Sequence, residues 1–345
     1  MSATGHKTIL VSGGAGFIGS TFVMQMLASQ SDLRIINVDA LTYAGNLENL
    51  QSLEQDDRHV FVHAEIQNKE LMHSLCEQYQ VEGIINIAAE SHVDRSINDA
   101  TPFIDTNIGG TVALLTVARN LKLKKFVQVS TDEVYGSLEM NSDEMFTEET
   151  SLAPNSPYSA SKASADMFVR AFHHTHDVPA VITRCSNNYG PRQFPEKLIP
   201  LMILNALESK PLPVYGDGMN VRDWIHVEDH CDAIKRAYEI GKPGEVYNIG
   251  SDNECSNLHI VHSLLEILGR SKDLIHFVKD RPGHDKRYAI DASKAKRELG
   301  WSPRIPFDKG LQDTVRWYQE HPEWCEHILS GQYRDYYSQQ YHRER

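Results

Sequence analysis

Two pairs of tyrosine and lysine in this sequence have the spacing at which a cation can activate a phenol. Tyr158 and Lys162, in the segment YSASK, lie early in a stretch with helical periodicity, where side chains four positions apart share one face. The ammonium would favour the phenolate, and lowering a tyrosine pKa from about 10 to about 7 needs about 4 kcal/mol of differential stabilisation. Tyr238 and Lys242 repeat the spacing at a helix end that runs into Lys-Pro-Gly. We favour Tyr158, because it follows the fifth expected strand, on the side where parallel sheets bind ligands.

An acidic pair, Asp132 and Glu133, follows the apolar run that ends at Thr131. One carboxyl can remove a proton while the other donates one, and an elimination reaction requires both. The alternative is a solvated acidic turn without a catalytic role. Adjacent residues of a strand point to opposite faces, so both carboxyls can serve one site only if the chain leaves the extended form by Thr131.

The segment GGAGFIG contains Gly13, Gly16 and Gly19 between a predicted strand and a predicted helix. Glycines there permit a tight turn and let backbone N–H groups approach a pyrophosphate at the positive end of a helix, although a purely structural turn has the same glycines. Asp39 ends the next predicted strand, about 20 residues beyond Gly19, where a carboxylate would bond ribose hydroxyls. No arginine follows it directly to accept a 2′-phosphate, so the sequence predicts NAD rather than NADP. An oxidised nicotinamide would add a second positive charge near Tyr158.

The elements that must position these residues alternate along the chain. β-Branched apolar runs predict strands at 7–13, 34–40, 59–66, 83–89, 124–130, 179–185 and 245–250. Helical patterns start at Phe17 and Asn68 and cover 102–120 and 156–176. Strands that are apolar on both faces and separated by helices predict an α/β fold, with a Rossmann-type, doubly wound parallel sheet covered on both sides.

A chain of 345 residues suits one large domain or two closely joined ones. From Asn188 the sequence becomes rich in Pro and Gly turns between shorter helices, which indicates a smaller carboxy-terminal lobe made of loops. We expect an NAD-binding domain over 1–187, completed by the strand at 245–250. We expect the smaller lobe over 188–330 and a tail over 331–345.

The composition excludes some classes of function. The chain has 34 basic and 47 acidic side chains, for a formal net charge of -13, which disfavours binding to nucleic-acid polymers. The five cysteines are scattered and show no metal-ligand spacing, so we expect reduced thiols and no bound metal. We also expect a cytoplasmic protein without a membrane association, because the sequence shows no apolar leader and no run of 18 apolar residues.

Together, GGAGFIG, Asp39 and YSASK resemble the extended short-chain dehydrogenase/reductase family, from Lys7 to about Glu320. The resemblance implies a Rossmann-type domain that holds NAD, a smaller lobe that holds a nucleotide sugar, and a homodimer formed through the helices that begin near Pro102 and Tyr158. The implied cofactor contacts are Gly13, Gly16, Phe17, Ile18, Gly19, Asp39, Ala40, Leu41, Thr42, Glu65, Ile66, Ile87, Ala88, Ala89, Glu90, Ser91, Thr106, Tyr158, Lys162 and Asn188. Glu65 is a departure, because relatives generally carry Gly-Asp-Ile where this chain has Ala-Glu-Ile.

The reaction is implied by the acidic pair. The family's epimerases normally have small or hydroxyl residues in place of Asp132 and Glu133, whereas its nucleotide-sugar 4,6-dehydratases have Asp-Glu. The implied catalytic residues are Thr131, Asp132, Glu133, Tyr158 and Lys162. The implied sugar and nucleotide contacts are Ser91, Thr131, Asn187, Lys197, Leu198, Pro213, Val214, Tyr215, Arg222, Asn257, Arg281 and His284. The alternatives are a 4-epimerase, a dehydratase of a different nucleotide sugar, and a non-catalytic NAD-binding scaffold. His92 has no evident partner and is expected to pack or hydrogen-bond.

Overall fold

The structure is a computed structural model that describes residues 6–330, so the predicted tail at 331–345 lies outside the described residues. Its centre is a parallel sheet with strand order β10-β6-β5-β4-β1-β2-β3, in which β1 pairs with both β2 and β4. The strands are β1 (Lys7–Ser12), β2 (Leu33–Asp39), β3 (His59–His63), β4 (Gly83–Asn86), β5 (Lys125–Thr131), β6 (Ala180–Cys185) and β10 (Val246–Ile249). The predicted doubly wound α/β fold is therefore confirmed, with every expected strand present.

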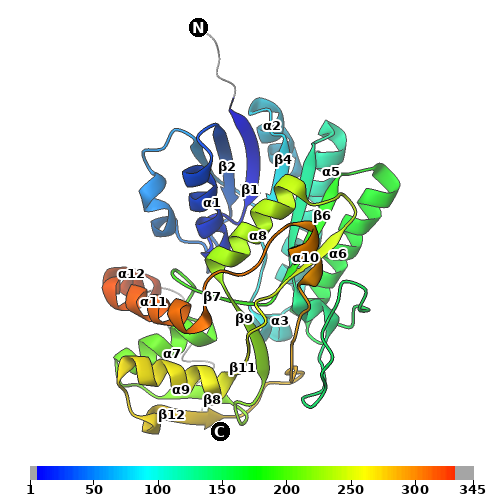
Figure 1. Cartoon of the computed structure of the whole chain (residues 1–345). Helices are drawn as coiled ribbons and strands as arrows, with labels where there is room; N and C mark the ends of the chain where they lie inside the picture. The colour runs from blue at the N-terminus through cyan, green and yellow to red at the C-terminus, as the bar shows by residue number, and fades with distance from the viewer. Residues whose placement is uncertain (1–5, 331–345) are drawn as a thin grey trace.

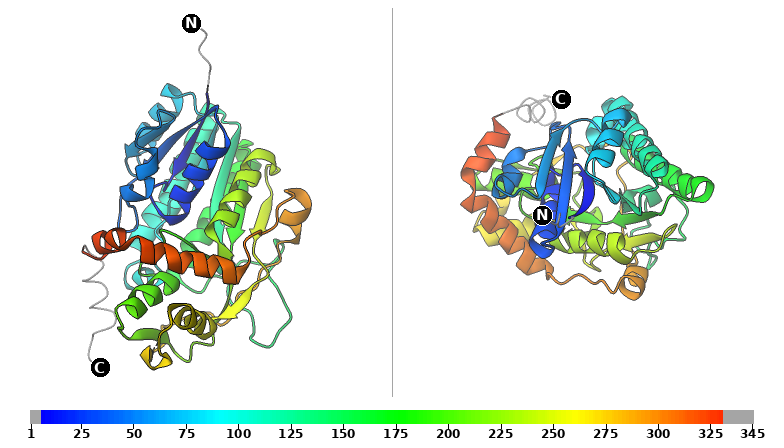
Figure 2. Two further views of the ribbon diagram at one scale, coloured as in Figure 1. Left: turned by 60° about the vertical axis from the view of Figure 1, so that its left-hand side comes forward. Right: turned by 90° about the horizontal axis from the view of Figure 1, so that it is seen from above.

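Helices cover both faces of this sheet, as Figures 1 and 2 show. One face packs on α2 (Lys69–Gln78), α5 (Thr111–Leu121) and α6 (Pro157–His176), and the other packs on α1 (Phe17–Ser29) and α8 (Val227–Ile240). Alternate residues of β5 separate the two layers: Phe126 joins the first core, whereas Val127 and Val129 join the second. Because both faces of the central strands are buried, apolar residues occur on both faces, as in β1 and β5.

The predicted helix over 102–120 follows the expected course but is not a regular α-helix. It consists of the short α4 (Thr101–Phe103), a π-helical segment η2 (Ile104–Gly110) and α5. A side chain at Gly110 would collide with Ile66, so this glycine permits a close approach to the loop after β3. Within the π-helical segment, Asn107 turns inward and hydrogen-bonds both backbone groups of Glu90. The irregular segment thus fixes the loop after β4, as π-bulges near functional sites often do.

The smaller lobe lies below the carboxyl ends of the sheet strands in Figure 1. It contains a three-stranded sheet, β11-β9-β7, and a parallel pair, β12-β8. Its strands are β7 (Asn187–Tyr189), β8 (Leu212–Tyr215), β9 (Val221–His226), β11 (Glu254–Ser256) and β12 (Ile275–Val278). Its helices are α7 (Leu198–Leu207), α9 (Asn257–Leu268), α11 (Phe307–Glu320) and α12 (Pro322–Leu329), and they enclose an apolar core of their own.

The remaining elements are short. They are α3 (Val93–Asn98), α10 (Ser293–Glu298) and the 3-10 turns η1 (Leu47–Leu53), η3 (Asp132–Tyr135) and η4 (Lys272–Leu274). In Figure 2 the last helices lie beside the early turn η1, where Trp324 donates a hydrogen bond of 2.9 Å to Asn49. None of the helices within 6–330 has the length and apolarity that crossing a bilayer would require.

Candidate active site

A cavity of about 320 Å³ opens at the carboxyl ends of β1, β2, β4 and β5, between the sheet and the smaller lobe. This is the edge at which parallel sheets bind ligands. All predicted cofactor contacts line it except Leu41, which lies on a neighbouring hollow with Thr42 and Tyr43. The five predicted catalytic residues also line it, and so do Ser91, Asn187 and Lys197. The structure therefore brings the sequence motifs to one cavity.

The glycine turn between β1 and α1 is shaped by close backbone packing. Gly13 has a φ of +73°, and a Cβ on it would lie 2.7 Å from the Ala88 backbone. A Cβ on Gly16 would instead meet only the Gly13 carbonyl, at 3.4 Å, and would otherwise take up cavity space. No side chain caps α1, so its first N–H groups remain available to an anion. Both features fit the pyrophosphate of a dinucleotide.

Asp39 ends β2 and holds this turn in place. One carboxylate oxygen accepts a 2.9 Å hydrogen bond from the Ala15 N–H, and the other accepts one of 2.8 Å from the Leu41 N–H. Burial raises the pKa of Asp39, while these two hydrogen bonds act in the opposite direction. A carboxylate has about four lone-pair positions, so it can still accept ribose hydroxyls.

We predict that the protein binds NAD at least tenfold more tightly than NADP, because a 2′-phosphate would meet the buried carboxylate of Asp39. Fluorescence titration with both cofactors measures the ratio. Asp39→Asn keeps the size of the side chain and removes its charge, so it should bring the dissociation constants for NAD and NADP closer together. Equal dissociation constants for the unaltered protein would contradict the assignment.

Tyr158 and Lys162 lie one helical turn apart near the start of α6, and both are buried. The Thr131 hydroxyl, at the end of β5, hydrogen-bonds the Tyr158 phenol. Burial raises the pKa of Tyr158 well above its ordinary value, and the carboxyls of Glu133 and Asp132 raise it further. The Lys162 ammonium donates a 2.7 Å hydrogen bond to the Val129 carbonyl. The nearby carboxyls thus oppose formation of the phenolate, and positive charge close to the phenol would favour it.

Thr131 is still extended, with φ -138° and ψ 153°, and the chain leaves the extended form at Asp132, one residue later than the sequence condition. The 3-10 turn η3 begins at Asp132, and the Thr131 hydroxyl accepts a hydrogen bond from the Glu133 N–H at 3.3 Å. Both carboxyls consequently reach the cavity. Asp132 is only 1% exposed, and burial followed by the charge of Glu133 raises its pKa well above the ordinary value. This direction of the shift favours the protonated, proton-donating form of Asp132, whereas Glu133 is only partly buried.

The competing pair, Tyr238 and Lys242, lies elsewhere. Tyr238 packs into the core between α8 and the sheet, where its ring lies under the Lys7 ammonium, and Lys242 forms an ion pair of 3.1 Å with Glu298. Neither residue lines the cavity. The geometry thus favours the choice of Tyr158 over Tyr238.

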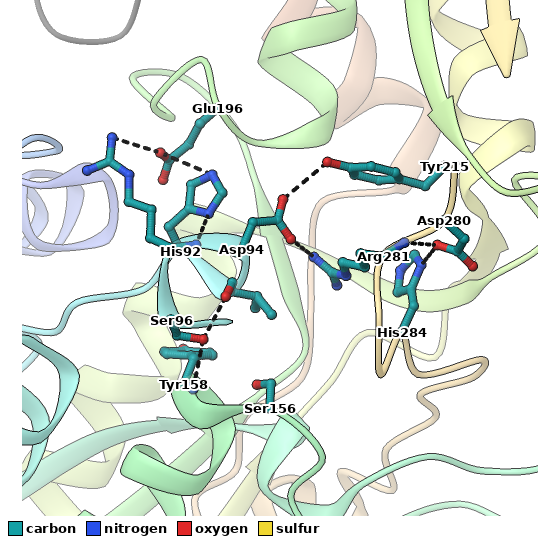
Figure 3. A network of polar contacts seen from close by, with 12 residues as sticks. His92, Asp94, Ser96, Ser156, Tyr158, Glu196, Tyr215, Asp280, Arg281 and His284 are labelled. Atoms are coloured by element: carbon teal, nitrogen blue, oxygen red, sulfur yellow. Dashed lines mark hydrogen bonds and ion pairs between the residues drawn. The ribbon is translucent and has the colours of Figure 1, made fainter. Parts of the chain in front are cut away.

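A polar network beside the cavity includes residues that the sequence motifs did not indicate (Figure 3). Glu196 lines the cavity with a side chain that is 1% exposed, and burial raises its pKa to about 7. His92 caps α3 by accepting a hydrogen bond from the Arg95 N–H, and its Nε2 atom lies 3.4 Å from the Glu196 carboxylate. Burial lowers the pKa of His92 to about 2, so its imidazole is neutral. Gln193 and Phe194 also line the cavity, and no local spacing signals either of them.

The predicted nucleotide contacts in the smaller lobe lie outside this cavity. They are Leu198, Pro213, Val214, Tyr215, Arg222, Asn257, Arg281 and His284. Val214 is a core residue of the lobe, and Arg222 is buried with its guanidinium on the carbonyls of Val221 and Asp285. Tyr215 and Arg281 both contact Asp94 of α3, at 3.2 and 3.4 Å (Figure 3). Their contact with a nucleotide remains a prediction.

The fold and the arrangement of the cavity define the class as the extended short-chain dehydrogenases/reductases. The sequence profile described as GDP-mannose 4,6 dehydratase matches residues 10–314. A curated dTDP-glucose 4,6-dehydratase of Xanthomonas campestris pv. campestris is 49% identical, over 95% of this chain and 97% of its own. One of Salmonella typhimurium is 48% identical, over 96% and 98%.

Solved structures give the same result. A dTDP-glucose 4,6-dehydratase of Bacillus anthracis in complex with NAD is 53% identical, with a TM-score of 0.88 over 93% of this chain and 99% of that one. One of Streptomyces venezuelae with NAD and TYD bound is 47% identical, with a TM-score of 0.90 over the same shares. A UDP-glucose 4-epimerase of Thermotoga maritima is 30% identical, with a TM-score of 0.83 over 91% and 99%. The chain belongs to the dTDP-glucose 4,6-dehydratase family, which confirms the predicted resemblance.

Proposed function

We propose that the protein converts dTDP-glucose to dTDP-4-keto-6-deoxyglucose and water. The observation that carries this proposal is the acidic pair at the end of β5. Asp132 is a buried carboxyl whose pKa is raised by burial, Glu133 is a partly buried one, and both line the cavity with Tyr158. A base and an acid on adjacent residues suit the removal of water across carbons 5 and 6, a step that 4-epimerisation does not include.

NAD is the cofactor of this proposal, and it is bound in both of the most informative solved relatives. The uncapped start of α1, the open space at Gly16 and the carboxylate of Asp39 would hold its pyrophosphate and ribose. When bound, NAD accepts a hydride from sugar carbon 4 and later returns it to carbon 6, so no net oxidation occurs.

The residues of the chain then move protons. Tyr158 removes the proton of the carbon-4 hydroxyl, aided by the charge of Lys162, and the Thr131 hydroxyl bonds the same sugar oxygen. The carbon-4 ketone acidifies carbon 5, and Glu133 takes that proton; a proton returns to carbon 5 from Glu133 when the hydride is added to carbon 6. Asp132 donates its proton to the hydroxyl leaving carbon 6, which departs as water. Burial suits Asp132 to this role, because it raises the pKa of the carboxyl and so favours the form that can donate a proton.

The smaller lobe supplies the nucleotide contacts in this proposal. Ser91, Asn187 and Lys197 line the cavity, and the Lys197 ammonium already donates a 2.9 Å hydrogen bond to the Ser91 carbonyl. Arg281 and Arg222 are suited to bind diphosphate oxygens, although both are now bonded within the protein. The division into an NAD-binding part, 1–187 with 245–250, and a lobe, 188–330, belongs to the same proposal.

Incubation with dTDP-glucose, UDP-glucose and GDP-mannose tests this function directly. We expect dTDP-glucose to give a product lighter by one water, identified by mass spectrometry, with no added reductant or oxidant. An isomer of unchanged mass would indicate an epimerase. Rapid turnover of a different nucleotide sugar would reassign the substrate, and binding of NAD without any product would favour a scaffold role.

We further propose that the protein is a cytoplasmic homodimer. All five cysteines are free, as in proteins of reducing compartments. Ile97 of α3, Ile104 of η2, and Met167 and Phe168 of α6 are between 41% and 53% exposed, on elements that contact one another. Such a patch on packed helices fits an interface with a second copy.

Phe168→Glu is expected to convert the dimer to a monomer, because it would bury a charge in the middle of the apolar patch. Sedimentation velocity at micromolar concentration measures the change in mass. Ile240→Glu, an exposed apolar residue at the end of α8, is the matched control and should not alter the mass. A monomeric unaltered protein would contradict the proposed dimer.

A further inference from the structure

Ser159, which directly follows Tyr158, contacts Glu133, the proposed base. It is fully buried in the first turn of α6, and its hydroxyl donates a 3.1 Å hydrogen bond to the Oε2 atom of Glu133. A second serine stands behind it: the Ser156 and Ser159 hydroxyl oxygens are 2.7 Å apart. Ser156 is also the N-cap of α6 and accepts the Ser159 N–H at 3.0 Å.

The donor and acceptor capacities of Ser156, Ser159 and Glu133 fix the direction of the hydrogen bonds between them. An ionised carboxylate can only accept, so the Ser159 hydrogen must point to Glu133. Ser159 has then used its one hydroxyl hydrogen, so in the contact between the two serines its oxygen must accept. The Ser156 hydroxyl is therefore the donor to Ser159. The two serines thus form a directed row that ends on the carboxylate.

The other polar groups near Glu133 do not replace this contact. Asp132 is itself acidic, and its Oδ1 atom accepts from the Thr131 hydroxyl at 3.3 Å. Arg281 interacts electrostatically with Glu133, but its guanidinium nitrogen Nη1 donates to Oδ1 of Asp94, at 3.4 Å. Within residues 6–330, Ser159 supplies the one hydrogen bond recorded to the Glu133 carboxylate.

We propose that Ser159 is a positioning residue for the elimination step, acting through Glu133; this inference rests on the proposed function. Its hydroxyl holds Oε2 and leaves Oε1 free to take the proton from sugar carbon 5. A hydrogen bond to a carboxylate is charge-assisted, so the contact with Ser159 is strongest before the proton transfer, when it orients the base.

Ser159→Ala tests this proposal through the two halves of the reaction. A single-turnover absorbance trace near 340 nm with dTDP-glucose reports oxidation at carbon 4 and the subsequent loss of reduced cofactor. We expect the rise to stay within about twofold of the unaltered protein and the decay to slow about tenfold, the loss expected for one hydrogen bond to a charged group. Equal slowing of both phases, or no slowing of the decay, would overturn the proposal.

A double-mutant cycle separates positioning from a general structural effect. Because Ser159 acts through Glu133, Ser159→Ala should slow the decay no further in a Glu133→Gln background, and a second tenfold loss there would contradict the proposal. Ser164→Ala is the matched control, because this hydroxyl of the same helix only bonds the Ala160 carbonyl, at 2.8 Å. It should leave both phases unchanged.

The same data distinguish failure of this inference from failure of the proposed function. If Glu133→Gln slows the decay and Ser159→Ala does not, only the role of Ser159 is wrong. If Glu133→Gln is fully active, the proposed base and this inference are both wrong. NAD binding and thermal unfolding show whether Ser159→Ala folds. If it does not, the two phases are measured in Ser156→Ala, and we expect a smaller slowing of the decay than for Ser159→Ala.

Discussion

Glu133→Gln should oxidise its substrate at carbon 4 at a nearly normal rate and then fail to complete the reaction. The amide keeps the shape of the side chain and its hydrogen bond with Ser159, but it cannot take the proton from carbon 5. Elimination should fall by about 10² to 10⁴, the range for loss of one general acid or base. Reduced NAD should therefore accumulate, which a single-turnover trace near 340 nm with dTDP-glucose measures. Solvent deuterium should no longer enter carbon 5 of the product.

Glu139→Gln is the matched control for this experiment. Glu139 is an exposed acid a few residues further along the chain, and its replacement should leave both phases unchanged. Normal turnover of Glu133→Gln, with deuterium still entering carbon 5, would show that a different residue is the base. The acidic pair would then be no more than a charged turn.

Tyr158→Phe should block the reaction one step earlier. It removes the phenol oxygen that bonds Thr131 but keeps the ring, whose centroid lies 6.3 Å from that of Phe103. We expect oxidation at carbon 4 to fall by at least about 10³, while the affinities for NAD and for the nucleotide sugar change little. Single-turnover absorbance and calorimetric titration measure the two quantities. Tyr238→Phe is the control and should be nearly silent, because Tyr238 lies in the core away from the cavity.

The same residue sets the direction of the pH dependence. Burial raises the pKa of Tyr158, and Glu133 and Asp132 raise it further, so the phenol keeps its proton at low pH. The rate of oxidation at carbon 4 should consequently rise with pH in the unaltered protein.

Loss of activity in Tyr238→Phe with retention in Tyr158→Phe would reverse our choice between the two tyrosines.

The parts of the site that sequence could predict are those in which spacing fixes geometry. Helical periodicity places Tyr158 and Lys162 on one face, and a glycine turn between a strand and a helix places Gly13 and Asp39 at one edge of the sheet. These relations are local or follow from the order of parallel strands. The resemblance supplied the role of the acidic pair. Strand geometry called for the chain to leave the extended form by Thr131, and it does so one residue later, where η3 begins.

The remaining parts depend on contacts between distant segments. Glu196 enters the cavity because the loop before α7 folds against α3, and nothing near it in sequence indicates burial. The Ser159 contact with Glu133 joins residues 26 positions apart on different elements. The sequence pattern around Asn107 predicts ordinary helix, whereas η2 is a π-helical segment. Asn107 bonds the backbone of Glu90, a contact between distant segments that apolar spacing does not indicate.

The order in which the sheet is assembled along the chain has a consequence for biosynthesis. α8, which covers Val127 and Val129 of β5, begins at Val227, and the edge strand β10 begins at Val246. Ribosomes add roughly 5–20 residues per second, so several seconds separate the emergence of β6 from that of these two elements. During that interval the nascent Rossmann-type half exposes an apolar sheet face and an unpaired parallel edge. Holding that face until α8 arrives is a task for chaperones bound near the ribosomal exit, and fragments that stop near residue 187 keep the same face uncovered.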